Sequence, residues 1–134
     1  MNTFIVEVRA ASPSWQSSEV SLAPGESAEI TATGSWGVID PAQRGNCGPG
    51  GNGVTSHGTF MGASIGAPEG CLLVRDGSAN ILAFTPTQER ITVHVPGLIT
   101  FVANDDPTPP QGWGFQGFGD NTGSLEVTIK VTQG

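Results

Sequence analysis

The chain has 134 residues, a length typical of one domain with its own hydrophobic core. Its formal net charge is −7 and its five basic residues are scattered, so neither nucleic acid nor an anionic membrane surface is an expected partner. Charged residues make up only 13% of the chain, beside 20 glycines and 10 prolines, and these two residues disfavour helix interiors, so an all-β fold with many loops is expected.

Alternation of apolar and polar residues marks the first strands. Phe4, Val6 and Val8 alternate with Glu7 and Arg9, a pattern typical of a half-buried strand. The same pattern recurs where Ala28, Ile30 and Ala32 alternate with Glu29 and Thr31, and further strands are expected at Val20–Leu22, Cys71–Arg75, Ile81–Phe84, Ile91–Val95, Leu98–Ala103 and Leu125–Val131. Tight turns are predicted at Pro24-Gly25 and Pro96-Gly97. Short strands with turns this frequent predict a single domain over residues 1–134, folded as a two-sheet β-sandwich.

A long glycine-rich excursion from Gly34 to Gly70 interrupts the strand pattern, and loops of this length are often functional. We expect an ordered loop that covers one end of the sandwich and could offer backbone carbonyls to a metal. Four side chains are available to hold it in place: Trp36, Cys47, His57 and Phe60.

Two clusters of short oxygen-bearing side chains lie near the end of the chain. The first is Asn104-Asp105-Asp106, and the second, Asp120-Asn121-Thr122-Gly123-Ser124, leads into the last predicted strand. Carboxylates and amides gathered at strand ends suit a hard cation such as Ca²⁺, which binds several oxygens at once. The sequence therefore predicts a calcium site between the two clusters.

These segments resemble the PA-I galactophilic lectin family. The resemblance covers most of the chain, from the Pro24-Gly25 turn through the glycine-rich loop and the segment Gly70–Gly77, and its most specific part is Asn104-Asp105 followed by Asp120–Ser124. It implies a jelly-roll-like galactose-binding sandwich, without enzymatic activity, in which Ca²⁺ bridges the protein and a terminal galactose. Galactose-containing glycans are then the expected ligands, and a homo-oligomer is the expected assembly because several weak sugar sites together gain avidity.

The resemblance also assigns site residues. The metal ligands would be Asp105, Asp120 and Asn121, joined by backbone carbonyls near Val38 or Ile39 and near Gly117. The sugar would be contacted by Asp105, Asp106, Asp120, His57 and Trp113. The chain departs from the family pattern in three ways: it has no tyrosine, the loop from Asp106 to Gly119 is longer, and an aspartate stands at position 120 in place of an amide.

Substitution of Asp105 is expected to abolish binding of both calcium and sugar while the sandwich still folds, because the residue follows its strand and is not expected in the core. Two roles are equally compatible with Trp113: its side chain stacks on a sugar ring, or it packs the loop onto the sandwich.

Two other functions are compatible with the residues. Gly62-Ala63-Ser64-Ile65-Gly66 has the spacing of a nucleophile elbow, and Asp76 and His94 follow in the order of a serine esterase, although no crossover helices are predicted. Alternatively, calcium could only stabilise the fold, or the aspartates and asparagines could be simple turn formers.

The cysteines and the chain start bear on the compartment. Cys47 and Cys71 leave a disulfide and two free thiols equally open, and with His57 and His94 they lack the short paired spacings of zinc sites. No apolar run approaches the roughly 20 residues of a membrane span, and no cleavable export signal is visible. We therefore expect a protein that is cytoplasmic or released without a cleavable signal, with cell-surface association also open.

Overall fold

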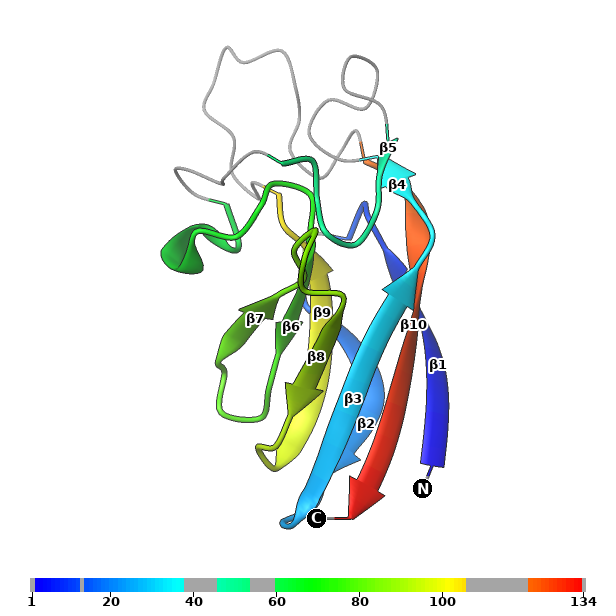
Figure 1. The fold of residues 1–134 in the computed structure, drawn as a ribbon, viewed down its shortest axis with the longest axis vertical. Coiled ribbons are helices and arrows are strands. Elements are labelled where there is room, and N and C mark those ends of the chain that lie inside the picture. Colours follow the sequence, from blue (N-terminus) through cyan, green and yellow to red (C-terminus); the bar gives the residue numbers. More distant parts are fainter. Residues whose placement is uncertain (1, 13, 38–45, 54–59, 106–120, 134) are drawn as a thin grey trace.

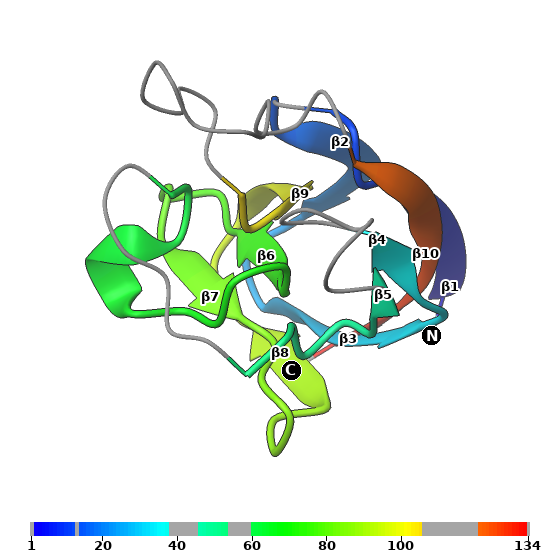
Figure 2. The same ribbon diagram turned by 90° about the horizontal axis from the view of Figure 1, so that it is seen from above.

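The computed structural model describes residues 2–12, 14–37, 46–53, 60–105 and 121–133, and within them the chain forms two antiparallel β-sheets (Figures 1 and 2). The strands are β1 (Asn2–Arg9), β2 (Gln16–Leu22), β3 (Glu26–Thr33), β4 (Trp36–Gly37), β5 (Asn46–Cys47), β6 (Leu72–Arg75), β7 (Ile81–Ala83), β8 (Arg90–Val93), β9 (Gly97–Ala103) and β10 (Thr122–Gln133), with one 3-10 turn, η1 (Ala63–Ile65).

One sheet has six strands in the order β5-β4-β10-β3-β8, with β1 also paired to β10, and the other has four in the order β2-β9-β6-β7. The long strand β10 is central to the first sheet, since it pairs with β1, β3 and β4. The predicted all-β, two-sheet sandwich is confirmed, and the predicted strands are present with ends that differ by a few residues.

The core lies between the sheets and is built from the alternating residues of both. Its largest fully buried side chains include Trp36, Phe84 and Phe101, together with Ile30, Leu72, Leu73, Ile99, Leu125 and Ile129. The opposite face of the six-stranded sheet is polar, because register places Glu7, Glu126 and Thr33 in one row across β1, β10 and β3. Ile5, on the same face as Glu7, is a 67% exposed apolar exception.

The first strand is less covered than its alternation predicts. Val8 is fully buried and Val6 half-buried, whereas Phe4 is 40% exposed although it lies on the same face of β1. Alternation alone shows which face of a strand points inward, but it does not show how far the second sheet extends beneath it.

The predicted tight turn at Pro24-Gly25 is confirmed, whereas at Pro96 the chain bends between β8 and β9 and Gly97 is the first residue of β9. The Glu26 amide donates to the Ala23 carbonyl at 3.0 Å and Gly25 has φ +88°, which is a type II turn with proline and glycine in their favoured positions. At Gly97 φ is +116°, and a Cβ on the facing Gly77 would overlap the Pro96 carbonyl oxygen. The β6–β7 turn and the bend before β9 therefore pack backbone against backbone.

The excursion after Gly34 contains two short strands that the sequence pattern did not indicate. Trp36 and Gly37 pair with Gly123 and Thr122 on one side and with β5 on the other, so this segment extends the six-stranded sheet. A two-residue strand has no alternation to detect, which is why it was missed. Of the four side chains expected to hold this segment, Trp36 and Phe60 are buried and Cys47 is half-buried, while His57 lies outside the described residues.

In the described part of the chain, the structure contains no helix with the length and apolarity needed to cross a membrane.

Candidate functional site

The acid proposed as the main metal ligand, Asp105, lies two residues after the end of β9. Its backbone carbonyl accepts a hydrogen bond from the Met61 amide at 3.0 Å, and its amide donates to the Ala103 carbonyl at 3.0 Å. The residue is 0% exposed. The expectation that Asp105 lies outside the core is therefore wrong: it follows the strand, but the segment 60–70 folds over it.

The neighbouring Asn104 explains how that segment is held. Its side-chain oxygen accepts a hydrogen bond from the Gly62 amide at 2.7 Å, and its side-chain nitrogen donates to the carbonyls of Ala67 at 3.2 Å and Pro68 at 2.7 Å. The residue is completely buried. Asn104 therefore has a structural role, joining the 3-10 segment to the end of β9 beside Asp105.

The second predicted ligand within the described residues, Asn121, immediately precedes β10. Its side-chain nitrogen donates to the Ala10 carbonyl at 2.9 Å, and this bond fixes the orientation of the amide. The other amide atom, Oδ1, is buried and accepts no hydrogen bond from the described part of the chain. A buried carbonyl oxygen needs a donor or a cation to offset its lost hydration, so Oδ1 fits the role of a metal ligand.

A series of contacts ties the two residues to the same end of the sandwich. Trp36 pairs with Gly123 in β10, and its indole nitrogen donates to the Gly70 carbonyl at 2.8 Å. The Gly70 amide in turn donates to the Asn104 carbonyl at 2.8 Å. Trp36 thus joins the start of β10 to the end of β9, and Figure 1 shows both strands reaching the same end of the molecule.

The other residues assigned by the family resemblance, Val38, Ile39, His57, Asp106, Trp113, Gly117 and Asp120, lie outside the described residues. Among the residues that are described, no group of three or more His, Cys, Asp or Glu could hold a metal ion. Calcium binding therefore stays a prediction, supported here by a buried carboxylate and a buried amide oxygen at one end of the fold.

One buried acid in this region was not predicted. Glu69 is 2% exposed. It precedes Gly70, whose carbonyl accepts a hydrogen bond from the Trp36 indole N–H. Pro68-Glu69-Gly70 is typical of an exposed turn, and no sequence signal distinguishes it from one. The backbone carbonyl of Glu69 accepts a hydrogen bond from the Asn52 amide at 3.0 Å. This bond holds the glycine-rich loop against the end of the sandwich that contains Asp105 and Asn121.

The two cysteines meet beside the Gly70 carbonyl and are both free thiols. Cys47 Sγ lies 3.6 Å from that carbonyl oxygen, and Cys71 follows it in the chain. Burial raises the pKa of the Cys71 thiol to about 12, with a further contribution from Cys47, and burial also raises the pKa of Cys47. Both thiols are therefore protonated and weakly nucleophilic at neutral pH.

The esterase residues do not assemble. Ser64 is exposed in η1, which is held at the end of β9, whereas the carboxylate of Asp76 accepts hydrogen bonds from Ser78 and Asn80 in the turn after β6. That turn packs at the start of β9, through the contact of Gly77 with Gly97. The seven residues of β9 separate the two places by about 20 Å, so Ser64 and Asp76 do not belong to one triad.

An open groove of about 770 Å³ lies elsewhere in the described structure, between the end of β3, Pro49-Gly50 and the loop from Phe84 to Arg90. It is lined by neither Asp105 nor Asn121. Phe84, the aromatic residue in its lining, is 1% exposed and offers little surface for stacking on a sugar ring.

The chain was compared with family models, curated proteins and solved structures. No family model matches the chain, and no curated protein matches it. Among solved structures, it resembles one described as "EclA N-terminal domain; PllA-like lectin", with 18% identity and a TM-score of 0.57 over 96% of each chain. The likeness covers nearly the whole of both chains, so the sandwich is a fold that a lectin domain also has.

Proposed function

We propose that this chain is a calcium-dependent lectin that binds terminal galactose-type sugars and has no enzymatic activity. The observation that carries the proposal is the orphaned side-chain oxygen of Asn121, buried at the same end of the sandwich as the carboxylate of Asp105. The similarity of the fold to a lectin domain supports the same function.

In the proposed site, Asp105 and Asn121 provide a carboxylate and an amide oxygen, and Asp120 adds a second carboxylate. Backbone carbonyls near Val38 or Ile39 and near Gly117 would complete the protein ligands. Calcium takes about six to eight oxygens, so positions remain for two neighbouring hydroxyls of a sugar.

The carboxylates have a second role toward the sugar. Asp105 and Asp120 would accept hydrogen bonds from the bound hydroxyls, and these charge-assisted bonds are shorter and stronger than neutral ones. Asp106, His57 and Trp113 are the further residues proposed to contact the sugar. Burial of Asp105 suits this role, because a desolvated carboxylate interacts more strongly with a cation than one exposed to water.

The proposal is tested by retention on a galactose resin. The parent protein is expected to bind in calcium, to elute with a chelator and to bind again when calcium is restored. Retention that is unchanged by the chelator would contradict the metal bridge. If calcium instead raises the unfolding temperature while no sugar on a glycan array binds, the metal only stabilises the fold.

A matched pair of variants separates the site from general stability. Asp105→Asn keeps the size of the side chain but removes its charge, and we expect calcium affinity to fall by about tenfold or more, since affinity follows the ligand charge. Asp76→Asn changes another buried carboxylate, in the turn after β6, and should leave calcium and sugar binding unchanged. Equal loss in both variants would show that binding depends on folding alone.

A further inference from the structure

The first strand forms an open edge of the six-stranded sheet. Among the strands that the structure describes, β1 pairs with β10 alone, in antiparallel register from Asn2 opposite Val131 to Arg9 opposite Ser124. No other described strand forms a backbone ladder with the second edge of β1. Its backbone groups on that side are therefore available to a further strand.

The direction of the backbone groups follows from two contacts at the end of β1. The Ala10 amide continues the ladder by donating to the Gly123 carbonyl at 3.0 Å. In an antiparallel pair the direction alternates from residue to residue, so the even-numbered residues of β1 bond to β10 and the odd-numbered ones point away. Arg9 confirms this, because its amide and carbonyl bond to Gln16 instead.

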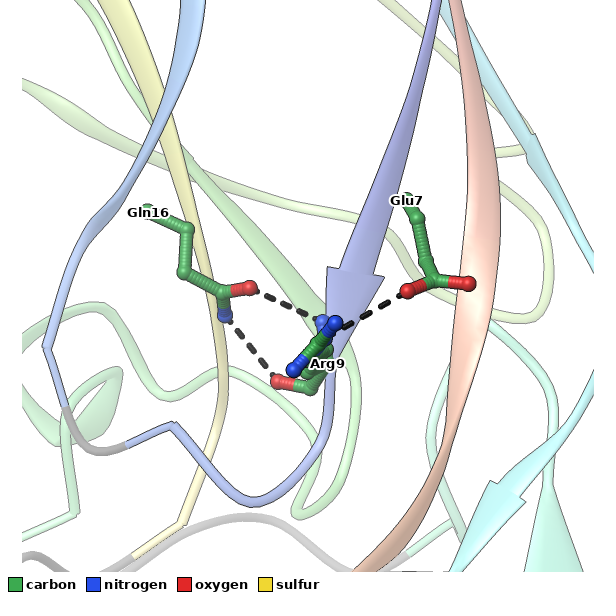
Figure 3. A network of polar contacts seen from close by, with 3 residues as sticks. All are labelled: Glu7, Arg9 and Gln16. Carbon is green, nitrogen blue, oxygen red and sulfur yellow. Dashed lines mark hydrogen bonds and ion pairs between the residues drawn. The ribbon is translucent and has the colours of Figure 1, made fainter.

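The Gln16 side chain closes the open edge at Arg9 (Figure 3). Its oxygen accepts the Arg9 amide at 2.9 Å and its nitrogen donates to the Arg9 carbonyl at 3.0 Å, which reproduces the bonding of a neighbouring strand. Three residues remain with outward-pointing amides and carbonyls: Thr3, Ile5 and Glu7.

The open edge of β1 from Asn2 to Val6 lacks the features that commonly prevent edge strands from pairing. Exposed edge strands commonly carry lysine, proline or a bulge that prevents pairing, and Asn2 to Val6 contain none of these. Instead the segment exposes apolar side chains on both faces, with Ile5 at 67% on the outer face and Phe4 at 40% on the inner one.

We propose that two copies of the chain pair antiparallel along β1, with the two-fold axis at Ile5. Thr3 of each copy then lies opposite Glu7 of the other, and Ile5 lies opposite Ile5. In this register all three outward-pointing residues form hydrogen-bonded pairs, and pairing ends where Gln16 closes the edge. The two six-stranded sheets become one continuous sheet.

The side chains favour a second copy over an unrelated strand. The proposed register places Phe4 of each copy opposite Val6 of the other on the inner face, while the two Ile5 side chains meet on the outer face. Apolar pairs therefore form on both faces at once, and Glu7 faces a threonine and not another carboxylate. Such self-complementarity is what a two-fold interface requires.

The dimer would have a consequence for binding, which rests on the proposed function. Asn121 bonds to Ala10, next to the Arg9 end of β1, so the candidate site lies at that end of the strand. Antiparallel pairing directs these ends away from each other. Two sugar sites would therefore face in opposite directions, an arrangement suited to linking glycans on two separate surfaces.

Light scattering after size-exclusion chromatography tests the dimer without calcium or sugar, so its failure is separate from that of the lectin proposal. The parent protein is expected to have twice the mass of the chain. Ile5→Pro removes an amide that β10 does not use, and Ile5→Lys places two charges together on the axis, so both variants should be monomers. Ile65→Lys changes an isoleucine that is 48% exposed in η1 and should remain a dimer.

A cysteine at the axis tests the register. Opposed Cα atoms in a hydrogen-bonded antiparallel pair are about 5.5 Å apart, within the range of a disulfide, so Ile5→Cys should give a covalent dimer on oxidation with a small-molecule disulfide. The parent, with its own two cysteines, and Ile65→Cys should not. A monomeric parent protein in light scattering would overturn the proposal, and so would dimers that persist in both Ile5→Pro and Ile5→Lys. If the parent is a dimer but Ile5→Cys does not cross-link, the proposed register is wrong.

Discussion

Single buried polar residues hold the candidate site together. Asn104 connects the strand end to the 3-10 segment through three hydrogen bonds, while Asn121 is oriented by one bond and keeps its oxygen for another partner. The two asparagines stand in similar sequence surroundings, each beside an aspartate at a strand end. Burial and bonding, which the sequence does not display, separate the structural amide from the candidate ligand.

Replacement of Asn104 is expected to destabilise the whole protein. Asn104→Ala removes the three hydrogen bonds to the Gly62 amide and to the carbonyls of Ala67 and Pro68, at a cost of about 3 kcal/mol in the free energy of unfolding. Urea denaturation measures this, with Gln133→Ala as the control because its amide makes a single exposed bond at 3.3 Å. A loss under about 1 kcal/mol would show that water replaces these bonds.

The raised pKa of the Cys71 thiol predicts that the free energy of unfolding falls at alkaline pH. Its pKa is raised from 9.0 to about 12 in the folded protein, so unfolded chains release this proton first as the pH rises. The stabilisation is complete below pH 9 and is lost as the pH rises toward 12, with a slope on the order of 1 kcal/mol per pH unit. Cys47, whose pKa burial also raises, is the other thiol that ionises in this range.

Thermal unfolding between pH 8 and pH 11 measures the Cys71 contribution. Cys71→Ala should show a flatter dependence on pH than the parent, although it is less stable overall. Cys47→Ala should retain most of the slope, because Cys47 is only half-buried. Identical slopes in the parent and Cys71→Ala would contradict the assignment.

At the scale of elements, close backbone contact between turns limits substitution. A Cβ on Gly77 would overlap the Pro96 carbonyl, so Gly77→Ala should lower the free energy of unfolding by about 2 kcal/mol or more. Gly25→Ala meets no atom within 4 Å and should cost about 1 kcal/mol, from its positive φ alone. Chemical denaturation compares the two variants, and an equal loss in both would exclude the proposed clash.

The same scale shows what sequence patterns predict well. Alternation identified the core face of β3, where Ala28 and Ile30 are buried, and the Pro24-Gly25 pair located its tight turn, because these signals depend on a few neighbouring residues. The strands β4 and β5 and the burial of Glu69 were not predicted. They depend on partners far along the chain, such as Trp36 pairing with Gly123, and no local pattern records such contacts.

For the molecule as a whole, the sandwich brings distant segments to one end. The chain reaches that end at Ala10, Trp36, Gly70, Asn104 and Asn121, and the hydrogen bonds among these residues connect the two sheets there. The oxygen clusters at the strand ends pointed to this arrangement from the sequence. The hydrogen bonds of the structure, and not the sequence, show that the side-chain oxygen of Asn121 remains available to a ligand at this end.

A calorimetric titration of the purified protein with galactose, run in millimolar calcium and again after a chelator, tests the proposed metal-bridged sugar site. We predict saturable binding in calcium, no heat of binding in chelator, and binding in calcium that is at least about tenfold weaker for Asp105→Asn. Galactose binding that persists in chelator, or a folded parent protein that binds neither calcium nor galactose, would contradict the proposed site.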